Sequence, residues 1–487
     1  MIKNILKNNY TKYINKEILI IVFLAFVIRS FFVFQDYPFV LHPDEPTVVN
    51  STINLRYDLN PKHFDWPTFY YYFTYPFFFI YEKVYFLLND LKIINDLVIE
   101  NINYYIISRF LTVGFGALST LMIYLILKNL KVSQNLALLG ACIMALIPFH
   151  VIRSAQALTD VPMVFFASLS VYFLTKNLDD FKDKFFLLSC FFAGLSVSTK
   201  YNGYMIFLIL GLFILYVKGF SFKDFWLYIK SALVSFLGFF VGTPYSVFDY
   251  QTFLITDNPK GALWQFNNVG KVDLPQQISN FFSNISYNYL NDMGYIPLIF
   301  SLTFIIFFII KKDFLKKDNY NKFILLLIIQ FFFILWSVSG VRIQRSHYLI
   351  LLYMFLPLFT ILFFHLYVKS TKFVNFIFSL IVLSSVYEFF LRVDDVSVIK
   401  FFYRAELTSA KENYLFLYNR KEVDLVLKEL KVRTEKTSQT DLSVSSKTTH
   451  AVLSYDICKF LNPCNFELLE RIESRSDSDI IYVFKKK

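Results

Sequence analysis

Apolar segments separated by short polar loops follow one another along most of the chain. A hydrocarbon core of ~30 Å is crossed by about 20 residues of helix. Several runs are shorter and would form tilted or re-entrant helices. The pattern predicts an all-α polytopic membrane protein with about 11 transmembrane helices. The predicted spans are Ile18–Phe34, Ile106–Leu127, Leu136–Phe149, Val161–Leu174, Phe185–Val197, Tyr204–Val217, Ser231–Gly242, Pro297–Ile310, Phe323–Gly340, Tyr348–Val368 and Phe373–Leu391.

Composition supports a membrane protein. Hydrophobic residues make up 56% of the chain and charged residues 17%, against roughly 25% charged residues in an average soluble protein. Too few polar side chains remain to cover a soluble globule of this length. Only four cysteines occur, which excludes a disulfide scaffold. The chain contains neither G-x-x-x-x-G-K-[ST] nor G-x-G-x-x-G, the glycine-rich motifs of nucleotide-binding folds.

The formal net charge of +11 comes largely from lysines in alternate loops. Positive residues stay on the cytoplasmic side of a membrane, so we expect the N-terminus inside. An odd number of spans then places the C-terminal tail outside. The expected location is the cytoplasmic (plasma) membrane. Because the lysines in these loops set the orientation of the protein in the membrane, nucleic acid is not expected as a partner.

The predicted transmembrane domain covers residues 1–391 and includes two long external segments. The first, residues 35–105, contains a Tyr-rich stretch from Phe73 to Leu88 that favours an interfacial helix. The second covers residues 243–295. After Leu391 the composition becomes polar, and residues 392–487 are expected to form a small α/β extracytoplasmic domain. In it we predict a helix at Ala405–Lys431 and strands at Ala451–Ile457 and Ile480–Phe484.

Two cysteines of this tail, Cys458 and Cys464, would lie in an oxidising space. A disulfide between them and a pair of free thiols are both open. Cys142 and Cys190 fall within spans and are expected to be packing residues.

Ionisable residues concentrate at the external ends of the spans, where each is a functional hypothesis. Asp44 and Glu45 lie between two prolines just after the first span. One carboxylate could serve as a general base, and a helix N-cap is the alternative. Asp160 precedes Pro162 and the fourth span, so helix capping is again an alternative.

Positive groups share the same external side. Lys200, between two short apolar runs, suggests an anionic partner, with a snorkelling lysine as the alternative. Arg342, Arg345 and His347 suit a phosphate, or more simply an anionic lipid headgroup. Arg153 and Arg109 lie at the external ends of other spans. Together the carboxylates and cations predict an external cavity for transfer from a lipid phosphate. No metal-ligand spacing appears, so no metal is implied, although two carboxylates could hold one weakly.

These motifs, in this order, resemble the GT-C superfamily of integral-membrane glycosyltransferases, and most of all family 39, which includes protein O-mannosyltransferases and aminoarabinose transferases. Each motif alone is weak, but their shared order and side make the set specific. The matching elements are Asp44-Glu45, Trp66-Pro-Thr-Phe-Tyr-Tyr-Tyr, Ser108-Arg109-Phe, Ala157-Leu-Thr-Asp160-Val-Pro162, Gly194-Leu195 to Thr199-Lys200-Tyr201, and Arg345-Ser-His347-Tyr348-Leu349 running to Pro357.

The resemblance implies an enzyme that moves a sugar from a polyprenyl-phosphate donor to a glycan, lipid or protein acceptor in one inverting step. It implies Asp44 as base, with Glu45 and Asp160 orienting it or the acceptor. The carrier phosphate would meet Lys200, Arg345, His347, Arg153 and Arg342, while His42, Arg109, Tyr201 and Tyr348 would support the site. No cofactor is expected.

Two other functions stay open. A transporter or lipid flippase would use the same cations to guide an anionic headgroup, and it predicts charges at mid-membrane and broken helices in inverted repeats. A glycan polymerase or ligase would take a lipid-pyrophosphate donor.

Overall fold

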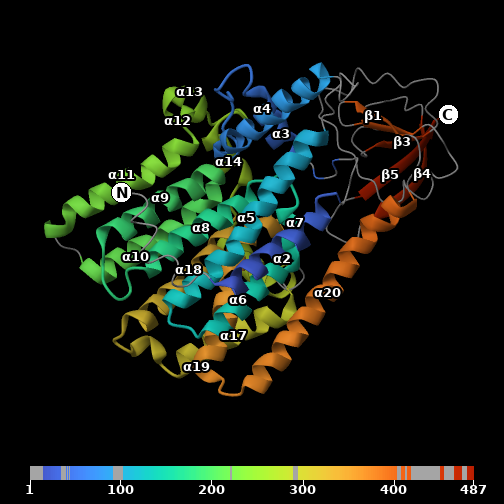
Figure 1. Cartoon of the computed structure of the whole chain (residues 1–487). Coiled ribbons are helices and arrows are strands. Elements are labelled where there is room, and N and C mark those ends of the chain that lie inside the picture. Colours follow the sequence, from blue (N-terminus) through green and yellow to red (C-terminus); the bar gives the residue numbers. More distant parts are fainter. Residues whose placement is uncertain are drawn as a thin grey trace. The chain divides into compact units, whose positions relative to one another are not determined.

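The computed structural model describes residues 15–34, 40, 42, 44–91, 102–219, 222–288 and 294–402, together with five strands between 407 and 486. Figure 1 shows these elements along the chain. They form two compact units. The first unit comprises residues 1–30, 48–96 and 107–385, and the second comprises 31–47, 97–106 and 386–487.

Helices make up the first unit. Four of the described helices are divided between the units: α2 (Lys16–Phe32), α3 (Glu45–Asn54), α5 (Ile102–Asn129) and α20 (Thr371–Phe402). The other elements are α4 (Phe69–Asp90), α6 (Gln134–Leu146), α7 (Pro148–Ser154), α8 (Asp160–Thr175), α9 (Asp183–Thr199), η1 (Tyr201–Ile206), α10 (Phe207–Lys218), η2 (Phe222–Asp224), α11 (Phe225–Gly242), α12 (Tyr245–Phe248), α13 (Tyr250–Phe253), α14 (Ala262–Val269), α15 (Leu274–Ser283), η3 (Asn284–Asn288), α17 (Tyr295–Ile310), η4 (Asp313–Leu315), α18 (Asn319–Ser339), η5 (Ser346–Met354) and α19 (Phe355–Tyr367).

The helices are those of an integral membrane protein. Within the described residues, five are long and apolar enough to cross a membrane: α5, η1 with α10, η2 with α11, α18, and η5 with α19. The bent pair α6–α7 would be a sixth span, and Asp160–Thr175, Tyr295–Ile310 and Thr371–Tyr387 are shorter apolar helices. The count of eleven spans stays a prediction. Helix α4 covers the segment that we predicted as an interfacial helix.

One predicted span differs from the structure in a way that shapes the site. Leu136–Phe149 is not one straight helix, because α6 ends at Leu146 and α7 continues at an angle of 61°. Pro148 has no N–H to donate to the preceding turn. Ile147 before it adopts an extended backbone (ψ 114°), as residues preceding proline do.

Small residues let the helices approach closely. A Cβ atom on Gly194 of α9 would lie 2.0 Å from the carbonyl oxygen of Ser235 on α11, and one on Gly238 would lie 2.1 Å from that of Phe191. Between α8 and α9, Ser170 and Ser189 exchange hydrogen bonds through their hydroxyls and carbonyls. Close backbone approach and hydroxyl hydrogen bonds are what hold membrane helices together.

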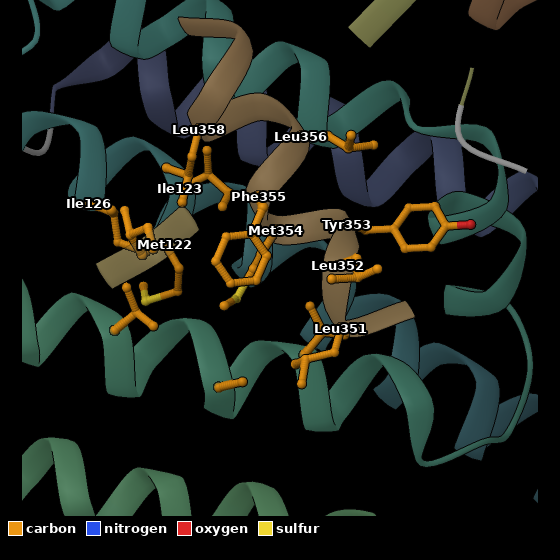
Figure 2. Packing of buried hydrophobic residues seen from close by; sticks show 14 of the residues in the cluster. Met122, Ile123, Ile126, Leu351, Leu352, Tyr353, Met354, Phe355, Leu356 and Leu358 are labelled. Atoms are coloured by element: carbon orange, nitrogen blue, oxygen red, sulfur yellow. The ribbon is translucent and has the colours of Figure 1, made fainter. Parts of the chain in front are cut away.

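The core of the first unit is apolar and completely buried. Figure 2 shows Met122, Ile123 and Ile126 of α5 beside the run from Leu351 to Leu358 of η5 and α19. The 61 phenylalanines of the chain contribute ring contacts such as Phe304 with Phe359, whose centroids lie 5.5 Å apart. This packing fixes η5, which begins at the candidate site.

The second unit contains a five-stranded sheet: β1 (Leu407–Lys411), β2 (Tyr414–Leu417), β3 (His450–Leu453), β4 (Phe466–Glu473) and β5 (Ile480–Lys486). The strand order is β1-β2-β3-β5-β4, and all neighbours are antiparallel. The predicted helix at Ala405–Lys431 is therefore wrong where β1 and β2 lie, because β1 pairs with β2 and β2 pairs with the distant β3. Cys458 and Cys464 lie outside the described residues.

Candidate functional site

A buried ion pair joins two neighbouring helices of the first unit. Asp160 is the first residue of α8, and Lys200 directly follows the last residue of α9. Because α8 and α9 pack against each other in opposite directions, these two ends meet (Figure 1). The Lys200 ammonium lies 2.6 Å from the Asp160 carboxylate, and the side chains are 13% and 2% exposed.

An aromatic ring lies beside this pair. The Lys200 ammonium is 5.6 Å from the ring centroid of Trp66, which lies in the turn before α4. The next residue, Tyr201, is buried and donates a hydrogen bond to the carbonyl of Phe64 at 2.6 Å. The turn carrying Trp66 is thus held against the end of α9.

The same turn is attached to α3 by a chain of polar contacts. The hydroxyl of Ser51 lies 2.9 Å from His63 Nε2, and His63 Nδ1 lies 2.8 Å from the Asp65 carboxylate. The second long segment contributes too, since the amide of Phe64 donates to the carbonyl of Lys260. These contacts fix the position of Trp66.

Arg153 of α7 faces His347 of η5. Their closest nitrogens, Nη2 of the arginine and Nδ1 of the imidazole, are 3.5 Å apart. Arginine can only donate, so Nδ1 of the imidazole is the acceptor in this contact. Arg153 also donates to Gln156 at 3.1 Å and lies over the ring of Phe149 at 5.0 Å.

His347 is the point at which the positive groups meet. The charges of Lys200, Arg153 and Arg345 all act on its ring. These residues come from three different parts of the sequence, at the end of α9, on α7 and just before η5. Tyr348 packs its ring against His347, with centroids 4.6 Å apart. The structure therefore brings four of the predicted phosphate-binding residues together.

Arg342 is directed elsewhere. Its guanidinium donates to the carbonyl of Asn268 at 3.4 Å and lies against Gly270 in the turn after α14. Within the described residues, none of its recorded contacts is with the His347 group. Arg109 is buried on α5, with 2% of its surface exposed, and its predicted supporting role stays a prediction.

The turn that carries Asp44 and leads into Glu45 belongs to the second unit. The amide of Asp44 donates to His42 Nδ1 at 3.2 Å, and the amide of Glu45 donates to the carbonyl of His42 at 3.3 Å. His42 thus closes the turn that starts α3, and the side chain of Glu45 is fully buried. The predicted roles of Asp44 and Glu45 stay predictions.

Sequence reasoning missed two site elements. Trp66 enters the sequence analysis only as part of an aromatic motif, because its cation–π partner Lys200 lies far along the chain. Arg29 has no role in the sequence analysis, although an ionisable residue within a predicted span is a signal for function. In the part of the chain that the structure describes, no group of three or more His, Cys, Asp or Glu side chains could hold a metal ion.

Comparison with known proteins identifies relatives. Residues 80–254 match the family described as dolichyl-phosphate-mannose-protein mannosyltransferase. No curated protein sequence matches the chain. Among solved structures, ArnT from Cupriavidus metallidurans bound to undecaprenyl phosphate has a TM-score of 0.52 at 12% identity, over 79% of this chain and 72% of that one.

Other structures match more weakly. The apo form of the same ArnT has a TM-score of 0.49 at 13% identity, covering 74% of this chain and 61% of that one. The Archaeoglobus fulgidus oligosaccharyltransferase tethered with an acceptor peptide has a TM-score of 0.48 at 15% identity, over 80% and 56%. The chain thus spans less than two thirds of the length of the chains in these two structures. The family match over residues 80–254 and the fold similarity to ArnT confirm the predicted resemblance to integral-membrane glycosyltransferases of the GT-C type.

Proposed function

We propose that the chain transfers a sugar from a polyprenyl-phosphate carrier to an acceptor hydroxyl on the extracytoplasmic face of the plasma membrane. The observation that carries this proposal is the group of positive side chains around His347. Arg153 lies 3.5 Å from the His347 ring, and the charges of Lys200 and Arg345 act on the same ring. A partly buried group of cations that includes arginines suits a phosphate.

The Lys200–Asp160 ion pair would help the cations around His347 to release the carrier phosphate after the reaction. Asp160 compensates Lys200 when no phosphate is bound, at 2.6 Å. An incoming phosphate shares the same ammonium and reduces its attraction to the carboxylate. Trp66, over Lys200, supplies an aromatic surface for the first part of the carrier or for the sugar ring.

In the proposed reaction, Asp44 accepts the proton of the acceptor hydroxyl. The oxygen then attacks the anomeric carbon from the face opposite the phosphate. The bond from that carbon to the phosphate oxygen breaks, and its electron pair leaves with the polyprenyl phosphate. Lys200, Arg345 and His347 stabilise the charge that develops there, and the configuration of the sugar inverts. Glu45 orients Asp44 or the acceptor.

The proposed orientation follows from the lysine distribution, with the N-terminus inside and the 392–487 domain outside. The lipid phosphates named for the similar proteins support the donor class. The matched family is named for dolichyl-phosphate-mannose, and the ArnT structure contains undecaprenyl phosphate. We propose a polyprenyl phosphate for this chain too, and a glycan, lipid or protein as acceptor.

A transporter has one observation in its favour, the broken span α6–α7. The break, however, lies next to α7, whose Arg153 is beside His347. There Arg153 adds a positive charge to the residues proposed to bind the donor phosphate. A polymerase or ligase with a lipid-pyrophosphate donor shares the same cations and differs only in the donor.

Comparative mass spectrometry of cell-envelope glycans tests the proposal. Cells lacking the protein are compared with cells expressing the wild type or Asp44→Asn. We expect one sugar modification to vanish with the gene, to return with the wild type and to stay absent with the variant. Identical glycans in all three strains would show that the chain is not a sugar transferase.

A further inference from the structure

Arg29 of α2 is fully buried, and every donor of its guanidinium is used. Arginine has five N–H donors, and five hydrogen bonds of 3.0–3.2 Å leave this side chain. The acceptors are the carbonyls of Ala25, Met144 and Ala145, the hydroxyl of Ser154 and Nδ1 of His150. None of the five is a carboxylate. An ionisable group fully buried within a predicted span is a functional hypothesis by default.

Two of these bonds go to the end of α6. The last carbonyls of a helix have no partner within it, and the break at Pro148 prevents α7 from supplying one. Arg29 donates to the carbonyls of Met144 and Ala145 instead. Its charge also complements the partial negative charge at a helix C-terminus. The 61° bend is thus closed by a side chain from another helix.

Two further bonds go to α7 itself. Arg29 donates to His150 Nδ1 and to the hydroxyl of Ser154, one turn apart on α7. The close approach depends on Gly116 of α5. A Cβ atom there would lie 2.8 Å from Nε of Arg29 and 2.3 Å from the Ser154 hydroxyl.

The residue before Ser154 is Arg153, which turns the other way, toward His347. Helix α7 has only seven residues, too few to hold its position alone. Arg29 forms hydrogen bonds with His150 and Ser154 of α7. Arg153 of the same helix lies beside His347, among the residues proposed to bind the donor phosphate.

We propose that Arg29 is a positioning residue that sets the α6–α7 bend and so holds Arg153 beside His347, where the donor phosphate binds. The proposal rests on the proposed function, and it assigns a role in donor affinity to a side chain that does not touch the donor.

Gln330 of α18 offers a matched control. It too is fully buried and closes a helix junction, accepting from the amide of Ile209 and donating to the carbonyl of Met205, where η1 meets α10. Gln330→Met removes a buried polar side chain of the same kind, whose hydrogen bonds go to η1 and α10 and not to α7.

The first test measures binding of undecaprenyl phosphate to the full-length protein in nanodiscs. Arg29→Met is expected to weaken binding about tenfold to a hundredfold, as small displacements of binding groups do. Arg153→Met should weaken binding to a similar extent. The double variant Arg29→Met with Arg153→Met should lose no more affinity than the weaker-binding single variant, because Arg29 acts through the position of Arg153. Gln330→Met should lower stability and leave the affinity unchanged.

Additive losses, or wild-type affinity in folded Arg29→Met, would overturn the proposal. If that variant does not fold, Gly116→Ala displaces Arg29 without removing it, and the same reduction in affinity is expected. Unchanged affinity in folded Gly116→Ala would then overturn the proposal.

A second measurement does not depend on the donor. In a chain whose four native cysteines are serine, Arg153→Cys and His347→Cys are joined by a short bifunctional thiol reagent, which replaces the reach of the two long side chains that meet at 3.5 Å. Cross-linking should fall when Arg29→Met is added and not when Gln330→Met is added. Equal cross-linking in all three backgrounds contradicts the positioning role. Failure of wild type to bind undecaprenyl phosphate, with this cross-linking pattern intact, would instead reject the proposed function.

Discussion

The ammonium of Lys200 and the carboxylate of Asp160 form a 2.6 Å ion pair between the end of α9 and the start of α8. Both side chains are largely buried, so removing one partner leaves a charge without compensation, at a cost of roughly 3–5 kcal/mol. A test of binding therefore needs both to be changed together.

Lys200→Met with Asp160→Asn is expected to keep the fold and to weaken binding of a polyprenyl-phosphate donor by about tenfold or more, since a hydrogen bond to a charged group contributes roughly 1.5–3 kcal/mol. The measurement is the Michaelis constant for the donor, or the affinity for the carrier phosphate.

The control is an ion pair outside the site. Lys131 and Asp179 form one at 2.8 Å with both side chains exposed. Exposed pairs contribute little, so Lys131→Met with Asp179→Asn should leave donor binding unchanged. Equal losses in both double variants would show that the effect is not specific to the site.

Asp44→Asn is expected to reduce turnover by about a hundredfold to ten-thousandfold, the usual contribution of a general base, with donor affinity retained. The variant keeps the size of the side chain, so the turn closed by His42 should persist. Sugar transfer in membrane vesicles measures turnover, and thermal denaturation checks folding. Near-normal turnover would refute the assignment.

Gly194→Leu is expected to separate α9 from α11. Its side chain would collide with the Ser235 carbonyl, which lies 2.0 Å from the Cβ position, and overpacking costs typically 1–3 kcal/mol. Gly211→Leu on α10 is the matched control, because nothing lies within 4 Å of its Cβ position. Melting temperatures in detergent should fall for the first variant only. A similar fall in the melting temperatures of both variants would show that the loss of stability does not come from the contact between α9 and α11.

Asp313 in η4, between α17 and α18, predicts an acid-dependent loss of stability. Burial raises the pKa of this carboxyl, but hydrogen bonds from Lys316 and Tyr367 and the charge of Lys311 outweigh it and hold the pKa below its usual value. A lowered pKa stabilises the fold above the unfolded value of about 3.9, and this stability is lost as pH falls through the folded value.

The melting temperatures of wild type and Asp313→Asn should therefore differ most near neutral pH and converge below about pH 4. Asp257→Asn, at an exposed position after α13, serves as the control. A constant difference between wild type and Asp313→Asn across the pH range would contradict this account.

The sequence sufficed to place the charged residues at helix ends, because an ionisable side chain in an apolar run has few other places to lie. Lys200 and Asp160 were found in this way. The hydrogen-bonding role of Arg29 could not be predicted from the sequence, because three of its five acceptors are backbone carbonyls, which any residue type supplies. Arg342 was grouped with Arg345 by proximity in sequence, yet it faces the turn at Gly270.

The strands of the second unit show a different limit. Leu407–Lys411 and Tyr414–Leu417 fall inside the segment Ala405–Lys431, which the sequence pattern assigned to a helix. Tyr414–Leu417 pairs with His450–Leu453, which lies far along the chain, and Leu407–Lys411 pairs with Tyr414–Leu417. β structure depends strongly on such partners. Local pattern alone favoured the wrong element.

The most direct measurement is the identity of the lipid retained by purified Asp44→Asn. A variant that binds the donor but does not turn it over should hold a sugar linked to a polyprenyl monophosphate, seen by mass spectrometry. Adding Lys200→Met and Asp160→Asn should remove it. A sugar linked through pyrophosphate, or the same lipid retained in both variants, would contradict the account.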